Sequence, residues 1–376
     1  MHGGKIPESG ETPRNPGILL SERIVNWQRL LERKDTPRFM VPFKNSLSLA
    51  LLLMAGCVTG FRAGAPRGAV GVIAHRGASA YAPENTLAAF STAIDMKADW
   101  FELDCKLTGD GVPIVIHDSE LDRTTSGKGL VTETPLAELK SLDAGSWFDA
   151  DYAEEPLPTL AESLDLAKDR IGVYLEIKSC ADDSALMQRL LHLVEGRAVL
   201  TPGLRAQMMS AIEASGTRNL ELTRKCIAEI RERHMRRQVV IQSFSPVVCF
   251  VALYEAPHIR VEFLGGDPED KPHIWQQYLE FGYLIGVDGF NVDHGALTKE
   301  RLDALHRGGK TVAVWTVDDA LQMRRYARWG VDAIITNKPD VCLRVLEEMG
   351  GRERDWRKAQ RRTRLPRTNP KLDEAI

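Results

Sequence analysis

The sequence has few cysteines, little net charge and no long apolar run, and each absence excludes a class of protein. Six cysteines in 376 residues, none in a C-x-x-C pair, provide neither a disulfide framework nor the spacing of a zinc site. A net charge of −3 argues against nucleic acid as the main partner. With 43% hydrophobic and 27% charged residues, the composition is that of a soluble globular domain, and no obligate protein partner is evident.

The apolar stretch at 46–56 has a core of about ten residues, too short for a bilayer-spanning helix, which needs about 20. Lys44 precedes it and Met-Ala-Gly-Cys ends it at Cys57, which is the pattern of a secretory signal. These four residues resemble the lipobox of bacterial lipoproteins, although Met54 replaces the usual leucine. The resemblance implies lipidation of Cys57 and a protein anchored to a membrane of the bacterial cell envelope, on its periplasmic or extracellular face.

The chain then divides into five segments. Met40 opens a complete signal peptide, so we interpret the residues before it as an extension upstream of the true start. The arginine-rich C-terminal segment has little apolar content and is typical of a disordered tail. The predicted segments are the extension 1–39, the lipoprotein-type signal peptide 40–57, a tether 58–70, a catalytic domain 71–349 and the basic tail 350–376.

Two carboxylates lie two residues apart in the strand-like segment WFELDCKL. Because side chains alternate sides along a strand, Glu102 and Asp104 should point to one face together with Trp100, while Phe101 and Leu103 face the other way. Neighbouring carboxylates on a mostly apolar strand repel each other and lose hydration. A divalent cation, or shifted pKa values, would relieve that repulsion.

Thr-Gly-Asp-Gly at 108–111 is a strong turn signal between this strand and the apolar run 112–117. The connection is too short for a parallel crossover, so we predict an antiparallel hairpin. A turn centred on Gly109 and Asp110 would pair residue 102 with residue 117, placing His117 beside Glu102.

Eight short apolar runs alternate with helical patterns, which indicates a parallel sheet, and eight such units over about 280 residues fit the size of a barrel. In a barrel of this kind the active site lies at the carboxyl ends of the strands. Polar residues stand at most of these ends in the sequence, and we expect them to converge on one rim. They are His75, Arg76, Glu102, Asp104, Glu176, Lys178, Gln242, Ser243, Asn291, Asp293, Trp315, Thr316, Asn337 and Lys338.

The chain resembles the glycerophosphodiester phosphodiesterase family over about residues 70–348. The motifs that carry the resemblance occur in the family's order: HRGASAYAPENTLAAF (75–90), ELDCKLTGDGVPIVIHD (102–118), LDRTTSGKG (121–129), LDAGSWF (142–148), PTLAESL (158–164), LEIK (175–178), QSF (242–244), WTVD (315–318) and GVDAIITNKPD (330–340). The resemblance implies a TIM (β/α)8 barrel of the phospholipase C-like phosphodiesterase type, with a small insertion after the second-strand hairpin. It also implies metal-dependent hydrolysis of small-molecule glycerophosphodiesters to glycerol 3-phosphate and an alcohol.

The chemistry of the side chains suggests their roles. Glu102, Asp104 and Glu176 offer three hard oxygen ligands, which favour Mg²⁺ or Ca²⁺. Arg76 and Lys178 would bind the remaining phosphate oxygens. The imidazoles, His75 and His117, would share the general acid and general base roles, and Trp315 could contact the glycerol moiety. The sequence does not assign the acid and the base, nor does it choose between a cyclic phosphate intermediate and direct attack by water.

We place the insertion at about 119–157 and interpret SGKG (126–129) within it as a turn rather than a phosphate cradle. Its aromatic residues, Trp147, Phe148 and Tyr152, are expected to pack rather than bind the alcohol. Two other functions stay open. One is a phospholipase D-like hydrolase of lysophospholipids or sphingolipids. The other is a binding lipoprotein without catalysis, although pure binding needs no acid–base pair.

Overall fold

The structure is a computed structural model that describes residues 70–266 and 272–350. The predicted N-terminal extension, signal peptide with Cys57, tether and basic tail lie outside these ranges, apart from residues 70 and 350. Within the described part of the chain, no helix combines the length and the apolar composition that crossing a membrane requires.

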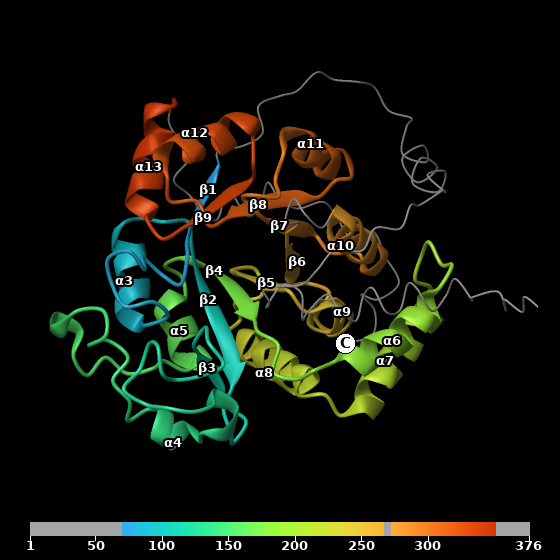
Figure 1. The fold of residues 1–376 in the computed structure, drawn as a ribbon, viewed down its shortest axis with the longest axis horizontal. Helices are drawn as coiled ribbons and strands as arrows, with labels where there is room; N and C mark the ends of the chain where they lie inside the picture. Colours follow the sequence, from blue (N-terminus) through green and yellow to red (C-terminus); the bar gives the residue numbers. More distant parts are fainter. Residues whose placement is uncertain (1–69, 267–271, 351–376) are drawn as a thin grey trace, which may run out of the picture.

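Eight parallel strands close into a barrel, because the first of them, β1, pairs with both its neighbour β2 and the last strand, β9. A ninth strand, β3, pairs only with β2. The predicted TIM barrel, with one hairpin arm outside it, is thereby confirmed (Figure 1). The strands are β1 (Gly71–Ala74), β2 (Trp100–Leu107), β3 (Pro113–Val115), β4 (Gly172–Ile177), β5 (Val239–Ser243), β6 (Arg260–Gly265), β7 (Gly289–Asp293), β8 (Thr311–Trp315) and β9 (Ala333–Thr336).

Helices surround the strands and cover the outer face of the barrel, with two additional helices, α6 and α7, between β4 and α8 (Figure 1). Most begin at a Thr, Ser or Asp whose side chain accepts from a backbone N–H of the first turn, as strong helix starts do. The helices are α3 (Leu87–Asp95), α4 (Leu136–Leu139), α5 (Leu160–Ala167), α6 (Ser184–Val194), α7 (Pro202–Ser215), α8 (Arg218–Glu232), α9 (Pro246–Glu255), α10 (Pro272–Ile285), α11 (Lys299–Arg307), α12 (Ala320–Trp329) and α13 (Pro339–Glu348).

The helix α3 follows an irregular loop after β1. Thr86 is its N-cap, so Pro83 is not in the first turn. Instead, the carbonyl oxygen of Pro83 accepts a hydrogen bond from the Thr86 hydroxyl at 2.7 Å. The residues between β1 and this cap therefore form an irregular loop, which is where the HRG and PENT motifs lie.

Side chains of β2 alternate between two environments, as predicted. Phe101 and Leu103 join the large apolar layer between strands and helices, whereas Trp100 points into the barrel. Trp100 fills the barrel interior across Gly71 and Gly172, where an added Cβ would lie 2.5 Å and 1.9 Å from its ring. Only glycine leaves room for the indole at these two positions, and the ring in turn closes the space beneath the polar rim.

The hairpin of β2 and β3 forms, but our predicted register is wrong by one residue. Cys105 pairs with Val115, so residue 103, not Glu102, stands across from residue 117. The cause is the turn, which has three residues rather than two: Thr108 N donates to Val112 O at 3.0 Å, and Gly111 adopts a left-handed φ of 80°.

The insertion between β3 and α5 has a small apolar core of its own, and two 3₁₀ turns, η1 (Val131–Glu133) and η2 (Ala150–Tyr152). SGKG (126–129) lies in an irregular stretch of the insertion, where Ser126 N donates to Asp143 O at 2.8 Å. Phe148 packs edge-to-face between Trp147 and Tyr152. The Tyr152 hydroxyl donates to the Tyr81 carbonyl, which fastens the insertion to the loop after β1.

Candidate active site

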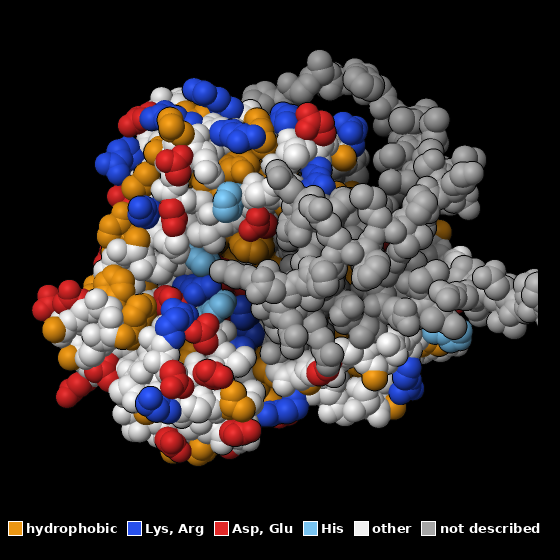
Figure 2. All heavy atoms as spheres, viewed as in Figure 1, with side chains coloured by type: hydrophobic (Ala, Val, Ile, Leu, Met, Phe, Trp, Pro, Cys, Tyr) orange, Lys and Arg blue, Asp and Glu red, His pale blue; other side chains and the backbone are white. Residues whose placement is uncertain are grey.

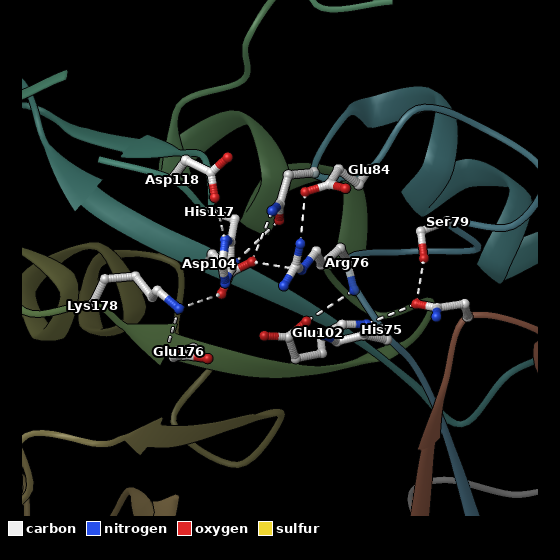
Figure 3. A network of polar contacts seen from close by, with 12 residues as sticks. His75, Arg76, Ser79, Glu84, Glu102, Asp104, His117, Asp118, Glu176 and Lys178 are labelled. Atoms are coloured by element: carbon white, nitrogen blue, oxygen red, sulfur yellow. Dashed lines mark hydrogen bonds and ion pairs between the residues drawn. The ribbon is translucent and has the colours of Figure 1, made fainter. Parts of the chain in front are cut away.

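Three carboxylates gather inside the barrel at the carboxyl ends of β2 and β4. Glu102 and Asp104 lie two residues apart on β2, and the parallel register places Glu176 of β4 directly beside Asp104. One oxygen atom from each lies within 4.8 Å of the other two, and all three side chains are buried. Figure 3 shows them with Arg76 and Lys178 in one polar network.

The electrostatics of this cluster fit a divalent cation. Burial, then the charges of Asp104 and Glu176, raises the pKa of Glu102 well above its ordinary value. Burial alone would also raise the pKa of Asp104, but Lys178 and Arg76 outweigh it and hold that pKa well below its usual range. A cation bound by all three carboxylates would relieve their repulsion, and oxygen donors are those that Mg²⁺ and Ca²⁺ prefer.

Two cationic side chains border the carboxylates. Lys178 Nζ lies 2.7 Å from Glu176 Oε1 and 3.4 Å from Asp104 Oδ1. Arg76 has a left-handed backbone, with φ of 53°, and its backbone N–H donates to Glu102 Oε2 at 2.8 Å. Its buried Nε is 3.3 Å from Asp104 Oδ2 but has no hydrogen-bond partner. An unpaired buried donor of this kind suits an anionic ligand such as a phosphate.

His75 follows β1 and is held by an amide. Its Nδ1 lies 2.7 Å from Asn337 Oδ1, and an amide oxygen only accepts, so Nδ1 carries a proton and Nε2 is the free nitrogen. Burial, followed by the charge of Arg76, lowers the pKa of His75 to about 4. The imidazole is therefore neutral at pH 7 and can accept a proton at Nε2.

His117 lies just beyond β3 and is held by a carboxylate. Its Nδ1 is 2.6 Å from Asp118 Oδ1, which again leaves Nε2 free. Burial lowers the pKa of His117, and Asp104 is the nearby charge that opposes this shift most strongly.

Several amides complete the polar interior, and sequence reasoning assigned them no role. Asn85 Nδ2 donates to Asp104 Oδ2 at 2.8 Å, and Asp104 N donates to Asn85 Oδ1 at 3.1 Å. Gln242 Nε2 lies 3.4 Å from Glu102 Oε1, and Asn291 Nδ2 donates to Gln242 Oε1 at 2.6 Å. Asn85 belongs to the PENT motif, and its place in one of the motifs that carry the family resemblance was the available signal.

The remaining residues expected at the rim behave differently. Trp315 ends β8 and is half-buried, with its Nε1–H bonded to Asn291 O at 2.9 Å and its ring edge-to-face with Phe244. Ser243 donates to the Ile177 carbonyl at 2.6 Å and Asp293 accepts from Gly295 N at 2.8 Å, so both serve local structure. Cys57 lies outside the described residues.

The surface above the cluster carries both charge signs. Figure 2 shows histidine, basic and acidic side chains gathered at a hollow near the middle of this face. A hollow with buried carboxylates, two flanking cations and two histidines with free Nε2 atoms can bind a metal-associated phosphate and move protons at its oxygens.

Comparisons with known proteins agree with this chemistry. A family model described as the glycerophosphoryl diester phosphodiesterase family matches residues 75–195 and 205–341. A glycerophosphodiester phosphodiesterase of Caldanaerobacter subterraneus is 33% identical over 281 residues, which cover 74% of this chain and 98% of that protein. One from Bacillus subtilis is 32% identical over 283 residues, 73% of this chain and 85% of that protein. A phosphodiesterase structure from Oleispira antarctica, in complex with the product sn-glycerol-3-phosphate, aligns with a TM-score of 0.59 and 28% identity over 74% of this chain and 97% of that one.

Proposed function

The chain belongs to the glycerophosphoryl diester phosphodiesterase family, and we propose that it hydrolyses glycerophosphodiesters to sn-glycerol 3-phosphate and an alcohol. The observation that carries the proposal is the buried trio of carboxylates between Arg76 and Lys178, with two histidines beside it. The product bound in the Oleispira antarctica enzyme supports the same product here.

We assign a divalent cation, Mg²⁺ or Ca²⁺, to Glu102, Asp104 and Glu176, whose oxygens are close enough to share one ion. When bound, such an ion would polarise a non-bridging phosphate oxygen and offset the negative charge that develops during displacement. The chain's own contribution is to hold three carboxylates close together in buried positions.

Arg76 and Lys178 bind the other phosphate oxygens in this proposal. Burial alone would lower the pKa of Lys178, but Glu176 and Asp104 raise it above its ordinary value, so the ammonium stays charged. The buried Nε of Arg76 lies 3.3 Å from Asp104 Oδ2 and forms no hydrogen bond, so it can donate to a phosphate oxygen. Fixed cations in a dry site stabilise phosphate charge more than cations in water would.

His75 and His117 transfer protons through their free Nε2 atoms. One accepts a proton from the attacking hydroxyl, either that of the glycerol next to the phosphate or that of water. The other, in its doubly protonated form, donates its Nε2 proton to the leaving alcohol oxygen. Trp315 supports the glycerol site, because its indole N–H is already bonded to Asn291 and its ring is left for hydrocarbon contact.

Parallel assays with glycerophosphocholine and a lysophosphatidylcholine test this substrate class. The proposal predicts release of glycerol 3-phosphate from the first substrate, with much slower turnover of the second. Preferential hydrolysis of the lysophospholipid would favour the phospholipase D-like alternative. Binding without turnover of either would indicate a binding lipoprotein.

We also propose that the enzyme is exported and anchored by lipid at Cys57. The support is the sequence pattern alone: a basic residue, a short apolar core and Met-Ala-Gly-Cys. Radiolabelled palmitate should be incorporated into the wild-type protein, which should fractionate with membranes, and neither should happen with Cys57→Ser. Equal labelling of both proteins would refute the anchor.

A further inference from the structure

An unbroken series of ion pairs joins Arg76 to His117 through three residues, which are Glu84, Arg123 and Asp118. Glu84 Oε1 accepts from Arg76 Nη1 at 2.7 Å and from Arg123 Nη2 at 2.7 Å, and Glu84 Oε2 accepts from Arg123 Nη1 at 3.0 Å. Arg123 Nε donates to Asp118 Oδ2, and Asp118 Oδ1 lies 2.6 Å from His117 Nδ1. Figure 3 shows the two ends of this series, Arg76 with Glu84 and His117 with Asp118.

Two of these residues, Glu84 and Arg123, come from different parts of the fold. Glu84 lies in the loop between β1 and α3, and Arg123 lies in the insertion after β3. Arg123 uses Nη1 and Nη2 on one carboxylate and Nε on another. Only a planar guanidinium can serve two carboxylates in this way, since a lysine ammonium is a point charge without the fork.

The charges along the series are balanced and partly shielded from water. The exposed fraction of the side chain is 14% for Glu84 and 18% for Arg76. Burial alone would raise the pKa of Asp118, but Arg123 and His117 lower it to about 2, so the carboxylate is ionised at neutral pH. An ionised Asp118 keeps the proton of His117 on Nδ1 and leaves Nε2 for the substrate.

We propose that Glu84 and Arg123 are positioning residues that hold Arg76 and His117 as one rigid unit across the mouth of the barrel. The inference rests on the proposed function, because its two ends are the proposed phosphate-binding and proton-transferring groups. Through Arg123, the insertion takes part in catalysis without contacting the substrate. Loss of the bridge would let both groups move, and a displacement of about 1 Å can cost about 100-fold in rate.

The test is a double-mutant cycle on release of glycerol 3-phosphate from glycerophosphocholine, with Arg123→Met, Glu84→Gln and the double variant. We expect each single variant to lose about 10- to 100-fold in kcat, with a smaller change in KM. The double variant should lose little more than the more damaged single one, because both act through the same bridge. Arg123→Lys should resemble Arg123→Met.

Two controls separate positioning from folding. Arg224 also joins two carboxylates, Glu213 and Glu255, but on outer helices, so Arg224→Met should keep wild-type kcat. Arg123→Gly should regain part of its kcat when guanidinium ion is added at concentrations far below those that denature proteins. A variant that merely folds poorly would not be rescued.

Single variants with near wild-type kcat, or losses that add fully in the double variant, would overturn the inference while leaving the proposed function intact. No turnover by the wild-type enzyme would instead refute the proposed function. The bridge can be examined even then by ¹⁵N NMR of His117, whose Nδ1 proton should exchange faster in Arg123→Met than in wild type. An unchanged Nδ1 proton signal would overturn the inference without reference to activity.

Discussion

Asn337 Oδ1 lies 2.7 Å from His75 Nδ1, so the segment after the last barrel strand orients the histidine that follows the first. The amide is itself fixed by Asp318: Asn337 Nδ2 donates to Asp318 Oδ2 at 2.6 Å, and Asn337 N donates to Asp318 Oδ1 at 2.8 Å. Closure of the barrel therefore also sets the tautomer of a proposed catalytic group, since β1 and β9 are adjacent only in a closed sheet.

Asn337→Ala should lower kcat by about tenfold or more, because His75 loses the acceptor that fixes its ring. Asn337→Asp should instead raise the pKa of His75, since a carboxylate stabilises the imidazolium, and move the acidic limb of the kcat/KM profile to higher pH. Ser79→Ala is the matched control, because it removes a different donor, at 2.8 Å, to the same Asn337 oxygen and leaves that oxygen in place for His75. Equal pH profiles for wild type and Asn337→Asp would contradict this role.

The lowered pKa of His75 predicts a pH-dependent stability. Burial and Arg76 lower the pKa to about 4 from 6.5. Between these values the unfolded chain binds a proton that the folded chain does not, so the free energy of unfolding should fall as the pH falls through this window. One such group contributes at most about 1.4 kcal/mol per pH unit. Urea unfolding in EDTA, repeated at several pH values, measures the free energy of unfolding as a function of pH. Between pH 4 and 6.5 this free energy should change less steeply with pH for His75→Gln than for wild type. Equal dependence on pH in the two proteins would refute the lowered pKa of His75.

Substitution of two buried glutamates, one inside the carboxylate cluster and one outside it, should change the melting temperature and its dependence on metal in opposite ways. Glu102→Gln removes repulsion, so the melting temperature in EDTA should not fall, but the increase on adding Mg²⁺ or Ca²⁺ should be lost. Glu262→Gln is the control, because Glu262 is buried and paired with Arg260 at 2.6 Å, away from the trio. It should lower the melting temperature in EDTA and keep the increase with metal. If the melting temperature of Glu102→Gln still rose as much as that of the wild type on adding metal, Glu102 would be excluded as a metal ligand.

The Trp100 ring leaves no room for a side chain at Gly172, so substitution of this glycine should destabilise the fold. A Cβ at Gly172 would lie 1.9 Å from the Trp100 ring, so Gly172→Ala should cost about 1–3 kcal/mol of unfolding free energy, or more. Gly203 is the control: it lies in the first turn of α7 with nothing within 4 Å of an added Cβ, and alanine there should be neutral or stabilising by up to about 1 kcal/mol. Chemical denaturation of both variants measures the difference.

The barrel and the positions of its strands could be predicted from the sequence, because apolar runs and strand-end polar residues follow directly from burial and from the direction of parallel strands. The hairpin register could not. The sequence is compatible with both a two-residue and a three-residue turn. In the folded chain Gly111 adopts a left-handed backbone, the turn has three residues, and the register follows from that length. The carboxylates still share one face, since that depends on parity within β2 alone.

The contacts that orient the two histidines also could not be predicted from the sequence. Asn337 is 262 residues from His75, and Arg123 is 39 residues from Glu84, in a segment of irregular structure. Short polar motifs such as PENT and LDRTT indicate that these residues are functional candidates, but their partners depend on how the loops fold over the rim. Asp118 is the exception, because it directly follows His117 and its contact with that histidine could have been predicted from their adjacency.

In the proposed reaction, His75, His117 and a cation held by Glu102, Asp104 and Glu176 act together on a glycerophosphodiester. The most direct measurement is the release of glycerol 3-phosphate from glycerophosphocholine by wild type, His75→Ala and His117→Ala, each with Mg²⁺ or Ca²⁺ and with EDTA. We predict turnover by the wild type with metal, abolished by EDTA and reduced by about 100-fold or more in each histidine variant. Full activity in either histidine variant, or wild-type turnover that EDTA does not change, would contradict the account.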